Sequence, residues 1–159
     1  MEGSKGKPHE AKEDVYTIEV FSDVDQEGVR EMGLAVSAEA GQVYDPARDS
    51  DWGQISEVYV NPGGVFYVVK SGGRIVGCAG VKNKGGGIAE FKRDRVMKDF
   101  RGRGIARDLF EKRIQFAREN NFRKIILDTN SPAIHHLCEQ FGFKKVGEDG
   151  GQTLYELDL

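Results

Sequence analysis

A short turn rich in glycine and arginine is the segment of this sequence best suited to bind an anion. Residues 100–107 read Phe-Arg-Gly-Arg-Gly-Ile-Ala-Arg and lead into a segment with helical periodicity. The first turn of a helix carries unpartnered backbone N–H groups and the positive end of the helix dipole, and glycines let an anion approach them closely. Arginines add paired hydrogen bonds to phosphoryl oxygens. The pattern predicts a phosphate-binding turn.

Two other interpretations fit part of this pattern. The turn is compatible with an ordinary strand-to-helix connection whose arginines are solvated. Residues 102–104 after a strand, with Asp128 ending the next strand, also fit a dinucleotide-binding turn. We discount the dinucleotide site because Arg107 stands where a third glycine would allow close helix packing. The preceding strand is also too charged for a central parallel strand, and the remaining chain is too short to complete that fold.

The elements before this turn follow strand and helix patterns in sequence. Residues 15–21 favour a strand at a sheet edge and residues 24–40 favour a helix, followed by a loop or short helices up to residue 58. Two hairpins come next. Their strands are expected at residues 65–69, 75–81 and 88–96, and their turns at residues 71–73 and 84–87.

The elements after the turn are a long helix, a strand, a second helix and a strand. Apolar residues recur at helical spacing from Ile105 to the boundary at 120–121. The apolar run 125–127 predicts a strand buried on both faces. A helix over 132–141, capped by Asn130-Ser131, and a closing strand over 153–157 complete the order.

Composition restricts the classes of protein that fit. The chain has 159 residues, of which 38% are hydrophobic, enough for one compact core. No run approaches the ~20 apolar residues that cross a bilayer, so no membrane association is expected. With 23 basic and 26 acidic residues the net charge is −3, which argues against a nucleic-acid partner bound through bulk phosphate neutralisation.

The cysteines and the start of the chain indicate a reduced, intracellular setting. Cys78 and Cys138 match neither a disulfide scaffold nor the paired spacing of a zinc site. Residues 1–14 combine glycine, proline and dense charge, which predicts a disordered tail, and they contain no apolar core of a signal peptide. We therefore expect a cytoplasmic chain with one domain over residues 15–159.

Four consecutive segments resemble the GCN5-related N-acetyltransferase (GNAT) superfamily. Arg101-x-x-Gly104-x-Ala106 is similar to the signature of these acetyl-CoA-dependent enzymes. Residues 89–96 resemble the family's fourth strand, Phe100 the aromatic residue before the signature, and residues 134–143 the helix before the final strands. The resemblance implies an α/β fold with a mixed, mostly antiparallel sheet, in which strands 4 and 5 splay apart to hold acetyl-CoA.

The resemblance also assigns cofactor-binding residues. The turn would bind the CoA pyrophosphate through main-chain N–H groups, which agrees with its chemistry. The backbone of the fourth strand would pair with the pantetheine arm beside Asp94, where an apolar residue is usual in the family. Either the Asp94 side chain points into the substrate pocket or the local strand geometry differs. The expected cofactor-binding residues are Asp94, Val96, Arg101, Gly102, Arg103, Gly104, Ile105, Ala106, Arg107 and Asn130.

Attack on a thioester requires a neutral amine, and alkylammonium groups have pKa values of ~10, so a base must take a proton. Glu90 corresponds to a position where many family members keep a carboxylate that acts through water. Alternatively, Glu90 is a solvated strand residue paired with Lys92 or Arg93. Asp128 is the reserve base, and its other roles would be to cap the following helix or to hold the substrate ammonium.

Cys138 stands where the family commonly has a tyrosine that protonates the departing CoA thiolate. An ordinary thiol pKa of about 8.5 would suit this role. Equally, Cys138 is an inert buried residue. A covalent acyl-cysteine is disfavoured, because the family transfers the acyl group directly within a ternary complex.

Four further polar or aromatic residues, two of them adjacent histidines, have alternative interpretations. The adjacent His135 and His136 face different directions on a helix, so no metal site is predicted. One of them lines the cofactor cleft, or both are partly exposed. Asn130 is a helix cap or a pantetheine contact. Trp52 shapes the acceptor pocket or covers one end of the core.

The sequence therefore predicts an acetyl-CoA-dependent N-acetyltransferase acting on a primary amine of a small molecule or amino-acid-like acceptor, with Glu90, Asp128 and Cys138 as catalytic candidates. A non-catalytic acyl-CoA-binding module and a peptide or protein N-terminal acetyltransferase are the rivals. The resemblance is compatible with a homodimer.

Overall fold

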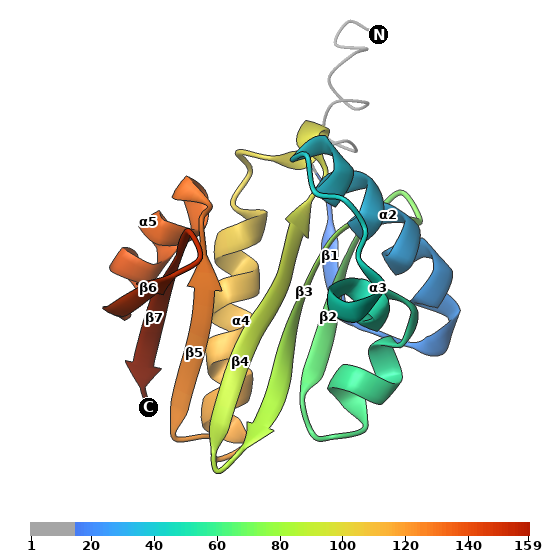
Figure 1. Cartoon of the computed structure of the whole chain (residues 1–159). Helices are drawn as coiled ribbons and strands as arrows, with labels where there is room; N and C mark the ends of the chain where they lie inside the picture. Colours follow the sequence, from blue (N-terminus) through green and yellow to red (C-terminus); the bar gives the residue numbers. More distant parts are fainter. Residues whose placement is uncertain (1–14) are drawn as a thin grey trace, which may run out of the picture.

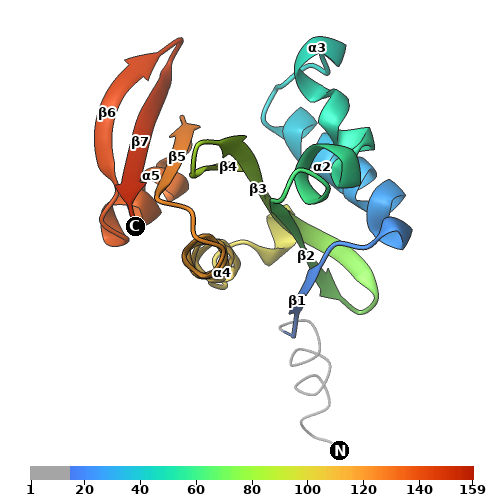
Figure 2. The ribbon, with the colours of Figure 1, turned by 90° about the horizontal axis from the view of Figure 1, so that it is seen from below.

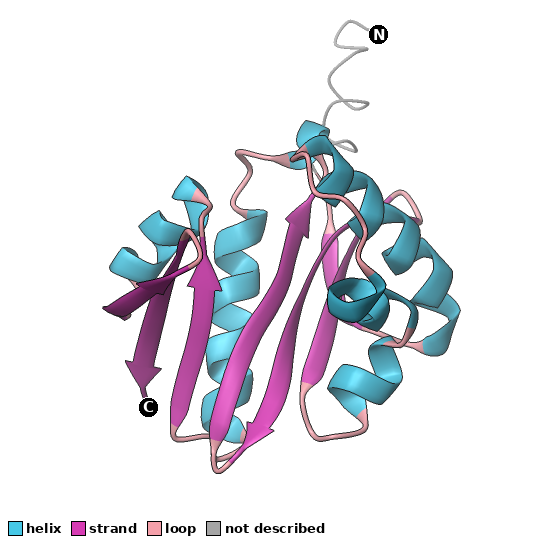
Figure 3. Ribbon diagram, viewed as in Figure 1, coloured by secondary structure: helices cyan, strands magenta, loops and turns pink. Residues whose placement is uncertain are grey.

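A computed structural model of the protein describes residues 15–159, which form one seven-stranded sheet with helices on both faces (Figures 1 and 3). The strand order is β1-β2-β3-β4-β5-β7-β6, and β4 and β5 are parallel while the other neighbouring pairs of this sheet are antiparallel. The strands are β1 Thr17–Val20, β2 Val65–Ser71, β3 Arg74–Gly85, β4 Ile88–Val96, β5 Lys124–Thr129, β6 Lys144–Asp149 and β7 Gln152–Asp158. The predicted mixed α/β fold is confirmed.

The helices divide between the two faces of the sheet. Figure 2 shows α4 on one side, and α2 and α3 on the other. The helices and helical turns are η1 Asp23–Asp25, α2 Gln26–Glu39, α3 Pro46–Asp49, η2 Ser50–Gly53, η3 Ser56–Val60, η4 Lys98–Phe100, α4 Ile105–Glu119 and α5 Pro132–Gln140. The predicted helices over 24–40, 105–120 and 132–141 and the short helices before residue 58 are confirmed.

Each face of the sheet has its own apolar core. Under α4 and α5, the core includes Leu109, Phe110 and Phe91. On the other face, α2 and the short helices bury Trp52 and Tyr59 against the sheet. Because successive side chains of a strand point to opposite faces of the sheet, the central strands contribute residues to both cores.

A glycine makes the contact between α2 and the short helices possible. A Cβ at Gly33 would lie 2.3 Å from the Trp52 ring, closer than atoms can approach. The ring therefore packs directly on the α2 backbone and is 1% exposed. This contact fixes the segment that follows α2 over one end of the sheet.

The two predicted hairpins are present, with turns formed by glycines at positive φ. Gly72 and Gly73, with φ of 58° and 78°, join β2 to β3. Gly86 and Gly87, with φ of 65° and 80°, join β3 to β4. The left-handed conformation favours glycine at these positions.

The structure corrects two expectations and leaves one outside its range. Of the run 125–127, Ile126 is only half-buried, so β5 buries one face instead of both. The strand β6 was not predicted from the pattern of apolar residues, because five of its six residues are exposed. The predicted tail, residues 1–14, lies outside the described residues.

Candidate active site

A divergence of two strands forms the centre of the site. β4 and β5 pair only from Ile88 to Glu90 and from Lys124 to Ile126. Beyond these residues both strands continue without pairing to each other, as Figure 1 shows by the separation of their arrowheads. The predicted splay of strands 4 and 5 is confirmed, and it leaves one edge of β4 available to a ligand that pairs with backbone.

The N-terminus of α4 lies at the same end of the sheet as this divergence (Figure 1). Gly104 is its N-cap residue, with φ of 87°, and Gly102 has φ of 78°. The first backbone bond of the helix joins the N–H of Asp108 to the Gly104 carbonyl over 3.0 Å. Within residues 15–159, the N–H groups of the four residues from Gly104 to Arg107 have no hydrogen-bond partner. They form a row of donors suited to phosphoryl oxygens.

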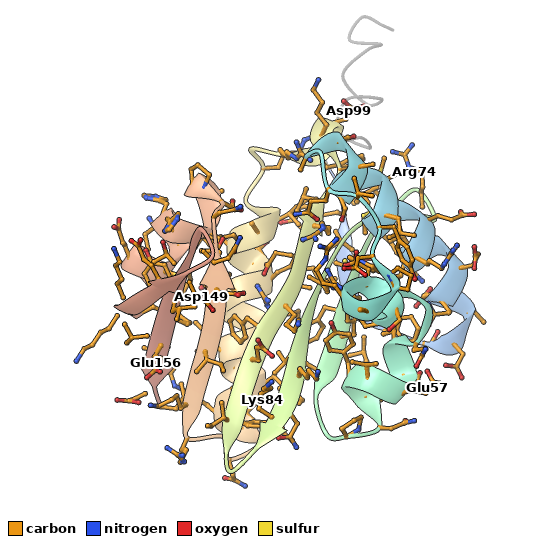
Figure 4. All side chains as sticks on the ribbon, viewed as in Figure 1. Glu57, Arg74, Lys84, Asp99, Asp149 and Glu156 are labelled. Carbon is orange, nitrogen blue, oxygen red and sulfur yellow. The ribbon has the colours of Figure 1, made fainter. Side chains whose placement is uncertain are left out.

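The three arginines of this turn are held by neighbours. Arg101 donates to the Val96 carbonyl over 2.9 Å and pairs with Glu39 over 3.2 Å. Arg103 donates over 3.0 Å to the carbonyl of Asp99, a residue of η4 that Figure 4 labels at the top of the view. Arg107 donates to Gln140 over 3.0 Å and its guanidinium lies 5.0 Å from the ring centroid of Phe141. They add positive charge to the segment that carries these donors.

A β-bulge interrupts β4 in the divergent segment. Gly80 of β3 is opposite Lys92, whereas Cys78 is opposite Arg95, so two β4 residues face the single residue Ala79. Arg93 has φ of 63° at this point. A bulge shifts the alternation of side chains by one residue. The residues after it therefore point to the faces opposite to those that uninterrupted alternation from Phe91 would give.

The bulge decides between the two interpretations of Asp94. Its carboxylate binds Arg113 of α4, with Nη1 and Oδ2 separated by 3.1 Å and a second bond from Nη2 to Oδ1. Asp94 thus points toward the α4 side, and the local strand geometry differs from an uninterrupted strand. Arg113 is completely buried and lies 4.2 Å from the Phe91 ring centroid. No motif in the sequence points to a role for Arg113.

Arg93 is held on the opposite face by the helical segment before β2. Its guanidinium binds Asp51 over 2.6 Å and Asp49 over 3.1 Å, and lies 5.0 Å from the Trp52 ring centroid. Tyr59 donates to Asp51 over 2.6 Å. Burial acts to raise the pKa of Asp51, but the bonds from Arg93 and Tyr59 outweigh it and hold that pKa below its ordinary value.

The structure places Glu90 at the point of divergence. Ala89 and Phe91 are buried beneath α4, so Glu90 points to the other face of the sheet. Its cationic neighbour is Lys84, at 3.7 Å, which Figure 4 labels beside the lower half of β4. The predicted pairing with Lys92 or Arg93 is therefore wrong, while the role of Glu90 as base stays a prediction.

Asp128 and Asn130 lie at the end of β5. Asp128 is exposed and belongs to the same face as half-buried Ile126. Its side chain has no partner among residues 15–159. It does not cap α5, because Ser131 is the N-cap residue and its hydroxyl accepts from Ile134 N–H. Asn130 is exposed beside this cap, so the assignment of the cap to Asn130 is wrong. Its contact with pantetheine stays a prediction.

Cys138 lies buried on α5, with the carboxylate of Asp94 among its charged neighbours. Burial, together with the charge of Asp94, raises the pKa of Cys138 to about 12. The thiol is therefore protonated at neutral pH. Its role as an acid stays a prediction.

The remaining candidates are the two histidines of α5 and Trp52. His135 Nδ1 lies 2.8 Å from the hydroxyl of Tyr155 on β7, and His136 is exposed. Within residues 15–159 no three His, Cys, Asp or Glu side chains are arranged to hold a metal ion. Trp52 covers one end of the core and also lines a small pocket between the end of α2 and the segment before β2. Its role in shaping the acceptor pocket stays a prediction.

The fold and this site agree with the family that the chain matches. The model of the acetyltransferase (GNAT) family matches residues 32–143. The chain belongs to this family of acyltransferases. The match includes the segment before β2, both hairpins, the α4 turn and α5.

The chain is also similar to curated proteins whose names describe the formation of N-acetyl compounds. The chain is 35% identical over 114 residues to N-acetylaspartate synthetase of Danio rerio, covering 69% of this chain and 40% of that protein. It is 31% identical over 106 residues to N-acetyltransferase 8F1 of Rattus norvegicus, covering 62% and 48%. The chain thus spans less than half the length of these relatives.

Solved structures share the fold. A GNAT-family acetyltransferase of Staphylococcus aureus superposes with a TM-score of 0.81 at 21% identity, over 91% of this chain and 99% of that one. A PaiA N-acetyltransferase of Thermoplasma acidophilum, solved with coenzyme A, has a TM-score of 0.73 at 16% identity, over 91% and 99%. None of the described helices of our chain is long and apolar enough to cross a membrane.

Proposed function

We propose that the chain is an acetyl-CoA-dependent N-acetyltransferase that acts on the primary amine of a small, amino-acid-like molecule. The observation that supports this most is the joint presence of a divergent β4–β5 pair and the unpartnered N–H groups at Gly104–Arg107. The open strand edge suits an amide-containing arm, and the helix end suits a pyrophosphate. These groups fit coenzyme A, which would supply the acetyl group as a thioester.

The pantetheine arm would pair with β4 between Asp94 and Val96. The carbonyl of Asp94 already accepts from Arg95 over 2.9 Å, and that of Val96 accepts from Arg101 over 2.9 Å. A carbonyl oxygen has two lone pairs, so each of these groups can accept a further bond. The arginines would then orient the edge of β4 for the ligand.

The acceptor would approach from the face opposite α4, since the first turn of α4 is taken by the cofactor. Glu90 and Asp128 point to this face. Glu90 would remove the ammonium proton through a water molecule, and Asp128 would hold the ammonium or serve as the reserve base. The neutral nitrogen then attacks the thioester carbon, the C–S bond breaks, and CoA leaves as its thiolate. The nitrogen, now bearing the acetyl group, loses a second proton, which the thiolate can take up to form free CoA.

Calorimetric titration with acetyl-CoA, without any acceptor, tests the first step. We expect one-to-one binding at micromolar concentrations, followed by release of free thiol in a screen of primary amines. Binding without thiol release would favour a non-catalytic acyl-CoA-binding module. Turnover only with peptides would favour an N-terminal acetyltransferase, and absence of binding would overturn the proposal.

A further inference from the structure

Three arginines near the divergent part of β4 differ in how their charge is balanced. Arg113 is paired with Asp94, and Arg93 is paired with two carboxylates. Arg95 is half-buried and forms no ion pair with any described residue. A guanidinium removed from water without a counter-ion is costly, so this site favours the binding of an anion.

The guanidinium of Arg95 is nevertheless fixed in position. Nε donates to Ser37 Oγ over 3.0 Å, Nη1 donates to the Asp94 carbonyl over 2.9 Å, and Nη2 lies 3.5 Å from Gln42 Oε1. Its carbon lies 5.6 Å from the Trp52 ring centroid. Because a guanidinium has five N–H groups, these three bonds leave two donors for a ligand.

The pKa of Arg95 also indicates that this site favours an anion. Burial holds the pKa of Arg95 below its ordinary value, which means that desolvation is not fully offset by nearby charge. An arginine stays protonated at neutral pH even so. An incoming carboxylate would therefore meet a charge that is present, held in place and poorly balanced.

A small pocket lies beside Arg95, between the end of α2 and the segment before β2. Ser37, Gln42 and Trp52 both line this pocket and contact Arg95. The acidic lining residue, Asp49, is already bound by Arg48 and Arg93. The rest of the wall is largely apolar, with Leu34 and Val43 among its residues.

We propose that this pocket receives a carboxylate group of the acceptor and that Arg95 is the residue that selects for it. The proposal rests on the acetyltransferase function above and narrows its substrate class to amines that carry a carboxylate. Two donors on one planar guanidinium match the two oxygens of that group. Arg95 follows Asp94 on the divergent segment and points toward α2, the face left to the acceptor.

The test compares each free amino acid with its α-carboxamide, which keeps the amine and the side chain but lacks the negative charge. Arg95→Gln should raise KM for the amino acid about 10- to 100-fold, the range for loss of a charged hydrogen bond, and should leave KM for the carboxamide within about threefold. The quantity compared is the KM for the amino acid divided by the KM for its carboxamide, in the variant and in the wild type. The two amines differ in basicity, but this difference affects both proteins equally and cancels. Acetyl-CoA binding should be unchanged.

A surface variant tests the same site without removing the arginine. Gln42→Glu places a carboxylate within reach of Arg95 and should compete with the acceptor, raising KM for amino acids only. Gln42 is exposed, so the fold should tolerate this change. Arg30→Gln, which removes an exposed arginine of α2 paired with Glu27, is the matched control and should change neither KM.

Calorimetry with amino acids in the presence of CoA gives a readout independent of turnover. Binding to the wild type and its loss in Arg95→Gln would support the inference. Equal effects of Arg95→Gln on amino acids and carboxamides, or no effect on either, would overturn it. If the wild type binds amino acids through Arg95 but acetylates no amine, the proposed function fails and the carboxylate site stands.

Discussion

Asp94 on β4 and Arg113 on α4 form a two-point ion pair that joins the divergent strand to the helix behind it. Arg113 is completely buried, whereas the Asp94 side chain is 21% exposed. The pair therefore fixes the position of the β4 bulge. It also explains how a charged residue occupies a place where the family usually has an apolar one.

Breaking this pair from one side should be costly. We expect Asp94→Leu to lower the free energy of unfolding by about 3–5 kcal/mol, because it leaves the buried Arg113 charge without its counter-ion. The double variant Asp94→Leu with Arg113→Met should recover most of the loss, since both charges are gone. Urea denaturation of the wild type, the two single variants and the double variant measures the free energies of unfolding that this comparison needs. Additive losses would show that the pair is not coupled.

Gly104 should be needed for cofactor binding and not for folding. Gly104→Leu should reduce acetyl-CoA affinity at least about tenfold, because a side chain would block approach to the free N–H groups. Gly73→Leu, in the β2–β3 turn, is the matched control: φ is 78° there and 87° at Gly104, and a Cβ at either would meet nothing within 4 Å.

Both variants should lose about 1–2 kcal/mol of stability from the left-handed backbone. Only the Gly104 variant should lose affinity in calorimetry. Full affinity in that variant would contradict the phosphate-binding turn.

Much of this fold was predictable because its patterns are local. The helix α4 carries its apolar residues at helical spacing, and the hairpin turns carry glycines where positive φ is required. The glycine-containing turn before α4 was predictable for the same reason, since its glycines stand directly before Ile105.

The parts that sequence reasoning missed depend on distant partners. Arg113 lies within the apolar stripe of α4, and only its pairing with Asp94, nineteen residues earlier, makes burial of the charge tolerable. The bulge at Arg93 reverses the alternation of β4, so no strand pattern predicts where Arg95 points. The strand β6 is almost wholly exposed, and therefore has no apolar alternation to reveal it.

Glu90 should act as the base. Glu90→Gln should lower kcat/KM about 100-fold or more near neutral pH, where the acceptor amine is protonated, and less at high pH, where the amine loses its proton without help. A pH profile of initial rates measures the difference. Glu156→Gln, which alters a carboxylate on β7 that is bound to Lys124, is the control and should leave the profile unchanged. An unaltered pH profile for Glu90→Gln would show that Glu90 is not the base. Asp128 would then be the candidate base, and Asp128→Asn would test it.

Cys138 should matter more for packing than for catalysis. With a pKa of about 12, the thiol is a weaker acid than the departing CoA thiol, whose ordinary pKa is about 8.5, so proton donation would be uphill. Cys138→Ala should therefore keep kcat within about threefold while lowering the melting temperature. A loss of 100-fold or more in kcat, with the fold intact, would instead establish Cys138 as the general acid.

The two buried thiols should make the protein unstable in alkali. Burial raises the pKa of Cys78 and that of Cys138 from 9.0 to about 12, so between these pH values the folded state holds protons that the unfolded state has released. The free energy of unfolding must then fall as pH rises, by at most about 1.4 kcal/mol per pH unit for each thiol. Below about pH 8 the thiols are almost fully protonated in both states, so the effect is nearly absent there.

Urea denaturation from pH 8 to pH 11 tests this, with Cys78→Val and Cys138→Ala combined. The double variant should show a shallower decline than the wild type, because the titrating groups are gone. Ile114→Val on α4 removes a buried methyl group but no titrating group, and should lower stability equally at every pH. Parallel curves for the wild type and the cysteine variant would mean that other groups, such as Tyr16 bound to Asp108 with its pKa raised to about 12, control alkaline stability.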